Sequence, residues 1–157
     1  RRTRQRTAPD RPRLRRGRNA PRLTTGFRKF SEPLTGAAAQ RQRQILELHR
    51  TDPLRAGNEY QQLVAENLRA ADVQEMFPRP RRRPDIGTGH EVTLEGMTRG
   101  FGTHKLDQIW LDLRDRGEVL LTVPRLSEAA ADQVRRLGAQ AEEEFGREVL
   151  IIIRETL

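Results

Sequence analysis

Two carboxylates flank a glycine-rich corner in the stretch Arg83-Pro84-Asp85-Ile86-Gly87-Thr88-Gly89-His90-Glu91-Val92-Thr93-Leu94. The glycines on either side of Thr88 suit a tight turn, because glycine adopts positive φ without steric cost. The stretch therefore predicts a hairpin of two strands that brings Asp85 and Glu91 close together. Two carboxylates held side by side repel each other unless a cation lies between them, so the pair indicates a divalent-metal site.

Several cationic and polar residues are placed to serve such a site. Lys105 and His104 lie at the predicted start of a helix. A positive charge there opposes the helix dipole, so the placement of these residues must have another cause. We expect Lys105 to stabilise charge on a phosphate and His104 to carry a proton; simple solvent exposure is the alternative for both. Gln108, one turn beyond His104, is expected to face the same way and to contact substrate. Four arginines just before the predicted hairpin are expected to bind backbone phosphates, or else to form a solvated strand end, and they are Arg79, Arg81, Arg82 and Arg83.

The surrounding sequence predicts alternating helices and strands. Helices are expected over residues 36–50, 54–71, 103–116 and 127–145, and strands over 73–77, 84–95 (the hairpin), 118–124 and 148–155. The continuous apolar character of the last two strands is typical of strands that are covered on both faces. Because an antiparallel meander precedes two crossover units, we expect an α/β (α+β) domain with a mixed central sheet of about five strands flanked by helices.

The charge of the chain is concentrated at its start. Residues 1–30 contain twelve Arg or Lys and one acidic residue, whereas the other 127 residues contain eighteen basic and twenty-one acidic ones, which sums to +8. Residues 1–35 are predicted to be a flexible basic arm, and residues 36–157 the folded domain with its core at 54–124. Arginines without interleaved aromatic residues favour sequence-independent contact with nucleic acid or another polyanion, and a solvated linker is the alternative.

The composition also excludes several classes of site. The chain has no cysteine, so disulfides and thiolate chemistry are excluded. No apolar run approaches the ~18 residues of a spanning helix, and we therefore expect no membrane partner. The glycines at 96, 100 and 102 lack the Lys-Ser/Thr of a phosphate-binding loop. The chain begins at Arg1, which fits a trimmed chain and a domain released from the C-terminal end of a longer polypeptide equally well.

The predicted order of helix, three strands, helix and strand resembles the restriction-endonuclease-like fold of PD-(D/E)XK nucleases over residues 54–124. Pro84-Asp85 and Glu91-Val92-Thr93 overlay the signature of that family, and Gly57-Asn58-Glu59 resembles its helix-borne glutamate. The resemblance implies that Asp85 and Glu91 hold Mg²⁺, or Mn²⁺, and that Glu59 adds a ligand. Thr93 stands where the family has its lysine, so Lys105 is expected to supply the catalytic cation.

The arginine-rich arm, the cysteine-free domain and the start at Arg1 also resemble C-terminal toxin domains of bacterial polymorphic or contractile-injection effectors. This resemblance implies a bacterial endonuclease for DNA, or less favourably RNA, that is cytoplasmic in its producer and delivered into a target cell. A cognate inhibitor protein or a delivery particle is then expected as a partner.

Two alternatives to an active nuclease stay open. Because of Thr93, the domain could be a degenerate nuclease fold that binds nucleic acid or a protein without cleavage. It could also be a cargo domain whose arm only drives loading into a larger particle.

Overall fold

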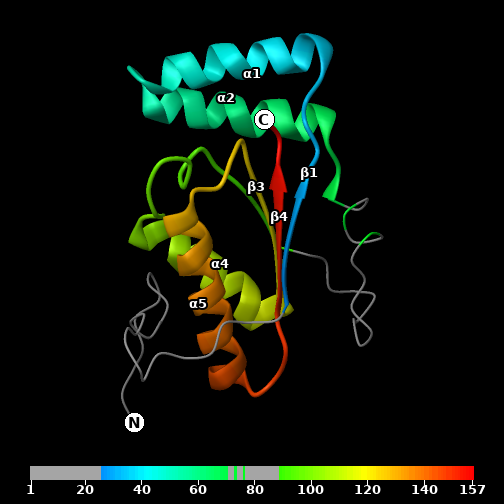
Figure 1. The fold of residues 1–157 in the computed structure, drawn as a ribbon, viewed down its shortest axis with the longest axis vertical. Helices are drawn as coiled ribbons and strands as arrows, with labels where there is room; N and C mark the ends of the chain where they lie inside the picture. Colours follow the sequence, from blue (N-terminus) through cyan, green and yellow to red (C-terminus); the bar gives the residue numbers. More distant parts are fainter. Residues whose placement is uncertain (1–25, 71–72, 74–75, 77–88) are drawn as a thin grey trace.

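The computed structural model describes residues 26–70, 73, 76 and 89–157. Within these residues four strands form one sheet in the order β1-β4-β3-β2, and every neighbouring pair is parallel. The strands are β1 (Phe27–Ser31), β2 (Gly89–Val92), β3 (Glu118–Val123) and β4 (Leu150–Glu155). The long helices are α1 (Gly36–His49), α2 (Pro53–Asn67), α4 (Thr103–Arg116) and α5 (Glu128–Phe145), as Figure 1 shows.

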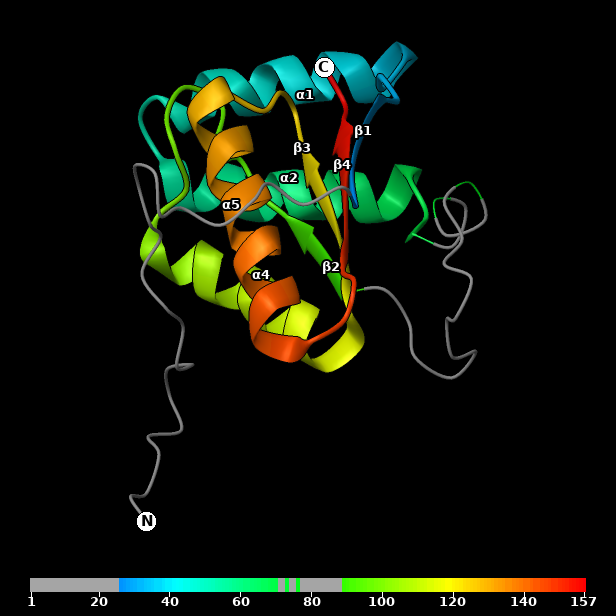
Figure 2. The ribbon, with the colours of Figure 1, turned by 60° about the horizontal axis from the view of Figure 1, so that its bottom comes forward.

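Helices α4 and α5 lie on the same face of the sheet, and they connect β2 to β3 and β3 to β4 (Figure 2). Alternate residues of β3 and β4 point into the core beneath these helices, because successive side chains of a strand face opposite sides. That core includes Val119, Leu121, Ile151, Ile153, Ile109, Leu113, Val134 and Leu137. Both helices end at a glycine with positive φ, Gly117 at 78° and Gly146 at 66°, which fits the predicted helix ends.

The opposite face of the sheet carries a fully buried arginine, Arg154 of β4. Its Nε donates to Thr122 Oγ1 at 3.2 Å, and its Nη1 donates to the Arg69 carbonyl at 3.0 Å. The same guanidinium lies 3.5 Å from His90 Nε2 and 3.6 Å from Glu32 Oε1. Because these partners come from four separate segments, Arg154 ties the edge strand β2 and the chain after α2 to the middle of the sheet.

Helices α1 and α2 lie across the carboxyl ends of the strands (Figure 1). Thr156, which follows β4, is held there by Tyr60 Oη at 2.7 Å and by Gln42, whose Nε2 donates to the Thr156 carbonyl at 3.0 Å. Apolar residues of both helices pack around these polar contacts together with Leu34 and Leu94. The helical pair therefore closes the end of the sheet at which the strands terminate.

The described sheet differs from the predicted one in direction and in number. A mixed sheet of about five strands was expected, and the described residues form four strands that are all parallel. The predicted antiparallel partner, in the first limb of the hairpin, lies outside the described residues, and β2 pairs parallel to β3. Val73 and Met76, predicted in a strand, are helical, and Val73 packs on Leu120 and Ile152. A short apolar run fits a buried helix as well as a strand, which explains the wrong assignment.

Strand β1 falls within residues 1–35, which the composition predicts to be a flexible arm. It pairs in parallel with β4, with Phe27 opposite Ile151 and Phe30 opposite Arg154. Phe27 packs toward the α4–α5 side and Phe30 toward the opposite side, since residues three apart in a strand face opposite ways. These two aromatic side chains supply the apolar contacts that the arginine-rich sequence around them lacks, so folded structure begins before residue 36.

Candidate functional site

The candidate site lies where the edge strand β2 meets helix α4. Glu91 lies on the same side of β2 as Gly89, and their register partners on β3, Leu121 and Val119, belong to the core beneath α4 and α5. On α4, three polar residues recur at intervals of three and four and form one stripe along the helix, and they are Lys105, Gln108 and Asp112. Contacts at both ends of β2 show that this stripe faces the strand.

At one end of the stripe, Lys105 Nζ lies 3.4 Å from Glu91 Oε1. Lys105 is only 8 % exposed, although it belongs to the first turn of α4, where a positive charge opposes the helix dipole. The ion pair with Glu91 explains this placement. The sequence predicted that these two residues share a site, and the structure brings them together; their catalytic roles stay predictions.

At the other end of the stripe, the Asp112 carboxyl packs directly over Gly89 and reaches the Glu91 carboxyl. Burial, and after it the hydrogen bond and the charge of Glu91, raise the pKa of Asp112 to about 7. Arg116 Nε is 3.9 Å from Asp112 Oδ1 and acts in the opposite direction. Near neutral pH, therefore, Asp112 either retains a proton or requires a further cation.

The oxygen atoms of this cluster suit a hard divalent cation. When the Asp112 and Glu91 carboxyls are both ionised, Asp112 Oδ2 is buried without a hydrogen-bond donor among the described residues, and so is Gln108 Oε1. A buried acceptor without a donor is costly, and a cation bound by Asp112 would satisfy its Oδ2. Mg²⁺ commonly binds through one or two carboxylates and fills its other positions with water and substrate phosphate. The described residues contain no cluster of three or more His, Asp or Glu with metal-binding geometry, so Glu91 and Asp112 are the two carboxylates available.

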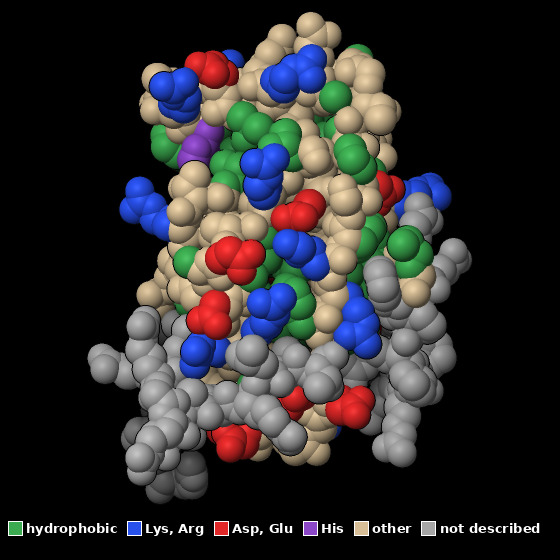
Figure 3. Space-filling view, in the orientation of Figure 1, with side chains coloured by type: hydrophobic (Ala, Val, Ile, Leu, Met, Phe, Trp, Pro, Cys, Tyr) green, Lys and Arg blue, Asp and Glu red, His purple; other side chains and the backbone are tan. Residues whose placement is uncertain are grey.

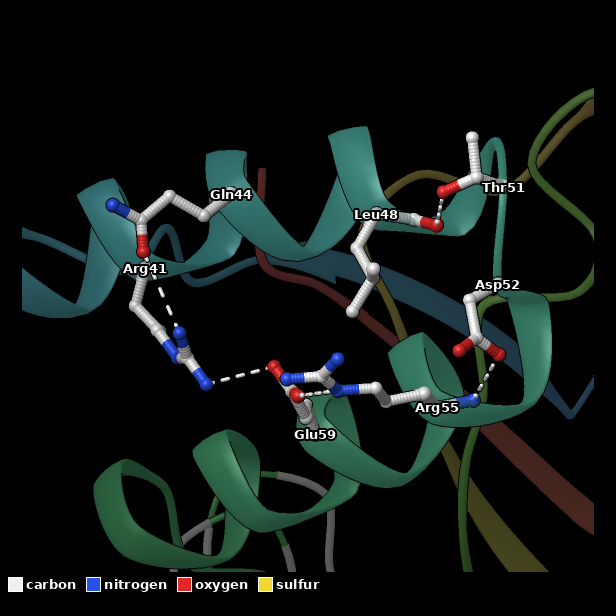
Figure 4. A network of polar contacts seen from close by, with 7 residues as sticks. All are labelled: Arg41, Gln44, Leu48, Thr51, Asp52, Arg55 and Glu59. Atoms are coloured by element: carbon white, nitrogen blue, oxygen red, sulfur yellow. Dashed lines mark hydrogen bonds and ion pairs between the residues drawn. The ribbon is translucent and has the colours of Figure 1, made fainter.

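Glu59, predicted as an additional metal ligand, contacts two arginines instead. Its carboxylate lies 2.7 Å from Arg41 Nη2 and 2.9 Å from Arg55 Nε, as Figure 4 shows. Two residues further along α2, Gln61 Nε2 donates to the Val92 carbonyl at 3.3 Å. Residues two apart on a helix point about 200° apart, so Glu59 faces away from β2 and toward α1. The structure does not bring Glu59 to Glu91.

Some of the other predicted residues lie beside the polar stripe of α4, and the rest lie outside the described residues. His104 is exposed, and its Nε2 lies 3.3 Å from Nε2 of the half-buried Gln108, so the expected shared orientation is present. Thr93, at the position of the family's lysine, is buried, and its Oγ1 accepts from the Glu95 amide at 3.0 Å. Asp85 and the arginine run at 79–83 lie outside the described residues.

Sequence reasoning missed Asp112, the second carboxylate of the site. Its chemistry gave no signal, because Asp107 and Asp115 on the same helix are equally acidic. Its position did give one, since residues 105, 108 and 112 keep the same spacing as the core residues Leu106, Ile109 and Leu113. A polar stripe running beside an apolar one indicates residues that are held against the protein rather than in solvent.

The described surface offers no continuous basic area on the face seen in Figure 3, where Lys and Arg side chains are interspersed with Asp and Glu. Among the described residues, no helix is both long and apolar enough to cross a lipid bilayer. Comparison of the chain with protein-family models, with curated proteins and with solved structures finds no match. The side chains around Glu91 therefore carry the functional inference.

The raised pKa of Asp112 predicts that the metal-free protein loses stability as pH rises. The carboxyl has an ordinary pKa of 3.8 and a folded value of about 7, so its contribution is fully present below about 4 and is lost as pH rises through 7. His90 gives the opposite slope, because burial of its inner edge and the charge of Arg154 lower its pKa from 6.5 to about 4.

Comparison of wild type with Asp112→Asn isolates the Asp112 contribution, since both proteins keep His90. Urea unfolding in EDTA from pH 5 to 8 is expected to show a growing advantage for Asp112→Asn. A constant difference between the two proteins across this range would contradict the prediction.

Proposed function

We propose that this domain is a Mg²⁺-dependent nuclease whose reaction centre is formed by Glu91, Asp112 and Lys105. The observation that carries the proposal is the contact between the Glu91 and Asp112 carboxyls beside the Lys105 ammonium. Two adjacent carboxylates, of which Asp112 has an unsatisfied oxygen, suit a hard cation, and an adjacent buried lysine suits a phosphate. DNA is the first expected substrate and RNA the second.

Hydrolysis joins a water oxygen to phosphorus, breaks the bond from phosphorus to one ester oxygen and moves a proton from the water to that leaving oxygen. A divalent cation held by Glu91 and Asp112, with Mn²⁺ as a substitute for Mg²⁺, would polarise the phosphate and acidify the attacking water. Asp112 then serves as a ligand of the cation, and the proton released by the attacking water passes to solvent. Lys105 is placed to offset negative charge on the phosphoryl oxygens. His104, exposed beside Gln108, is the proposed donor to the leaving oxygen.

The binding partners follow from the same proposal. The arginines at 79, 81, 82 and 83 and the basic arm are proposed to hold nucleic-acid phosphates, and Asp85 to add a ligand. Delivery into a target cell as a bacterial toxin, with a cognate inhibitor protein or a carrier particle, extends the proposal to the biological setting.

One observation favours a second candidate, a module that binds nucleic acid without cleaving it. Lys105 and Glu91 already neutralise each other, and Thr93 is occupied in a local turn where the resembling family has a free lysine. If the pair is only a structural contact between α4 and β2, the basic residues could still hold a polyanion.

Incubation with nucleic acid in Mg²⁺ and in EDTA distinguishes these functions. Supercoiled plasmid, single-stranded DNA and single-stranded RNA are each offered to the wild type and to Glu91→Gln, which keeps the size of the side chain. We expect Mg²⁺-dependent cleavage of DNA by the wild type and no detectable cleavage by Glu91→Gln. A gel shift without cleavage in Mg²⁺ and in Mn²⁺ would reject the nuclease and select the binding module.

A further inference from the structure

Gly89, the first residue of β2, has no backbone reason to be glycine. The described glycines with positive φ are Gly36, Gly96, Gly117 and Gly146, and Gly89 is not among them. It pairs in regular register with Val119 of β3. Glycine weakens a strand because it adds no packing surface and loses the most freedom on folding. A requirement for space is therefore the remaining physical reason for glycine at this position.

The space at Gly89 is occupied by one functional group. A Cβ at this position would lie 2.3 Å from Asp112 Cγ, 2.5 Å from its Oδ1 and 2.7 Å from its Oδ2. All three distances are shorter than any real Cβ contact, so the carboxyl would have to move. The helix behind it cannot retreat easily, since its neighbours Ile109 and Leu113 are fully buried in the main core.

We propose that Gly89 is a positioning residue of the metal site, because the missing side chain admits the Asp112 carboxyl to its place beside Glu91. The inference rests on the proposed function. A methyl group at Gly89 turns the Asp112 carboxyl away and separates the two carboxylates. The Lys105–Glu91 ion pair, at the other end of the site, stays in place.

Binding of Mn²⁺ alone, followed by electron paramagnetic resonance, tests this role without any requirement for activity. Gly89→Ala is expected to bind Mn²⁺ at least about tenfold more weakly than wild type, the range for residues that orient a metal ligand. Gly57→Ala is the matched control, because nothing lies within 4 Å of a Cβ at that helical glycine. It is expected to bind Mn²⁺ like wild type.

The variants Glu91→Gln and Asp112→Asn separate the two hypotheses. Both are expected to lose Mn²⁺ affinity. If they do and Gly89→Ala keeps the wild-type affinity, the role of Gly89 is overturned and the proposed function stands. If both keep the wild-type affinity, the metal site itself is absent, and the role of Gly89 falls with it.

A stability cycle keeps the inference testable if Gly89→Ala folds poorly. In the Asp112→Ala background the carboxyl is gone, and with it the three atoms that lie nearest to the added methyl group. Gly89→Ala is therefore expected to lower Tm clearly in the wild type and to leave Tm nearly unchanged in the Asp112→Ala background. An equal loss of Tm in both backgrounds would show that the methyl group meets something other than Asp112 and would overturn the inference.

Discussion

Replacement of Asp112 by asparagine is expected to lower the rate of Mg²⁺-dependent cleavage by at least about 100-fold, the upper end of the range for residues that only orient a metal ligand. The amide has the same size but carries no negative charge to hold the cation. Above pH 7 the same change is expected to stabilise the protein, because a neutral amide beside Glu91 removes the repulsion between two carboxylates. A variant that cleaves more slowly but is more stable would show that the Asp112 carboxylate supports the reaction and lowers the stability of the fold.

The matched control for this change is Asp132→Asn on α5. Asp132 is an exposed carboxylate whose Oδ2 accepts from Arg136 Nε at 2.9 Å. Its loss is expected to leave the cleavage rate unchanged, because an exposed ion pair contributes little and lies on another helix. Plasmid cleavage in excess Mg²⁺ and urea unfolding at pH 8 measure both quantities. A wild-type cleavage rate in Asp112→Asn, or a lower stability at pH 8, would contradict the assignment of Asp112.

Arg154→Met is expected to lower the free energy of unfolding by about 2–4 kcal/mol, the cost of a lost buried polar cluster. Methionine has a similar length but donates no hydrogen bond, so the Arg69 carbonyl and Thr122 Oγ1 lose a donor. The hydrogen bonds from Arg154 compensate for the removal of these acceptors from water, and methionine cannot replace them. Because His90 also loses this neighbour, the edge strand that carries Glu91 is expected to become less firmly attached.

An exposed arginine provides the comparison for Arg154. Arg43 on α1 is exposed, and Arg43→Met is expected to change stability by less than about 0.5 kcal/mol. Urea unfolding of both variants, at a pH where His90 is neutral, gives the two values. Hydrogen exchange of the β2 amides adds a local measurement, and faster exchange is expected only in Arg154→Met. Equal stability of the two variants would show that the buried arginine contributes little.

Helices and central strands were predictable because their patterns are long and their ends are marked. The apolar residues of α4 keep the helical period, and Gly117 ends it in the left-handed conformation that glycine adopts most readily. Strands β3 and β4 consist of continuous apolar residues, which is the pattern of strands covered on both faces. In these elements local preference and tertiary burial point to the same structure.

Strand direction was not predictable, because it depends on contacts that are distant in sequence. The glycines around Thr88 favour a reversal of the chain, whereas β2 pairs only in parallel with β3 among the described residues. The short strand β1 was hidden for a similar reason: only Phe27 and Phe30 indicate burial within an arginine-rich segment. The strand forms because β4 provides a parallel partner for it, and the sequence around β1 does not indicate that partner.

The candidate site was predictable in part for the same physical reason. Glu91 and Lys105 were chosen for their chemistry, and their elements happen to meet. Asp112 comes to the site through the packing of α4 on β2. Its spacing along α4 indicates that it is held against the protein, but not that Glu91 is its neighbour. Glu59 fits the expected motif, but the orientation of α2 turns it toward Arg41 and Arg55.

The placement of α1 and α2 has a practical consequence for the study of this protein. Open parallel sheets commonly bind their ligands at the carboxyl ends of the strands, and here that end is filled by Tyr60, Gln42 and Thr156. The proposed site lies instead at the lateral margin of the sheet, at β2, and contains no residue of α1 or α2. A fluorescent dye or an affinity tag attached at Leu54, which lies on α2 and is 77 % exposed, is expected to leave the proposed site undisturbed.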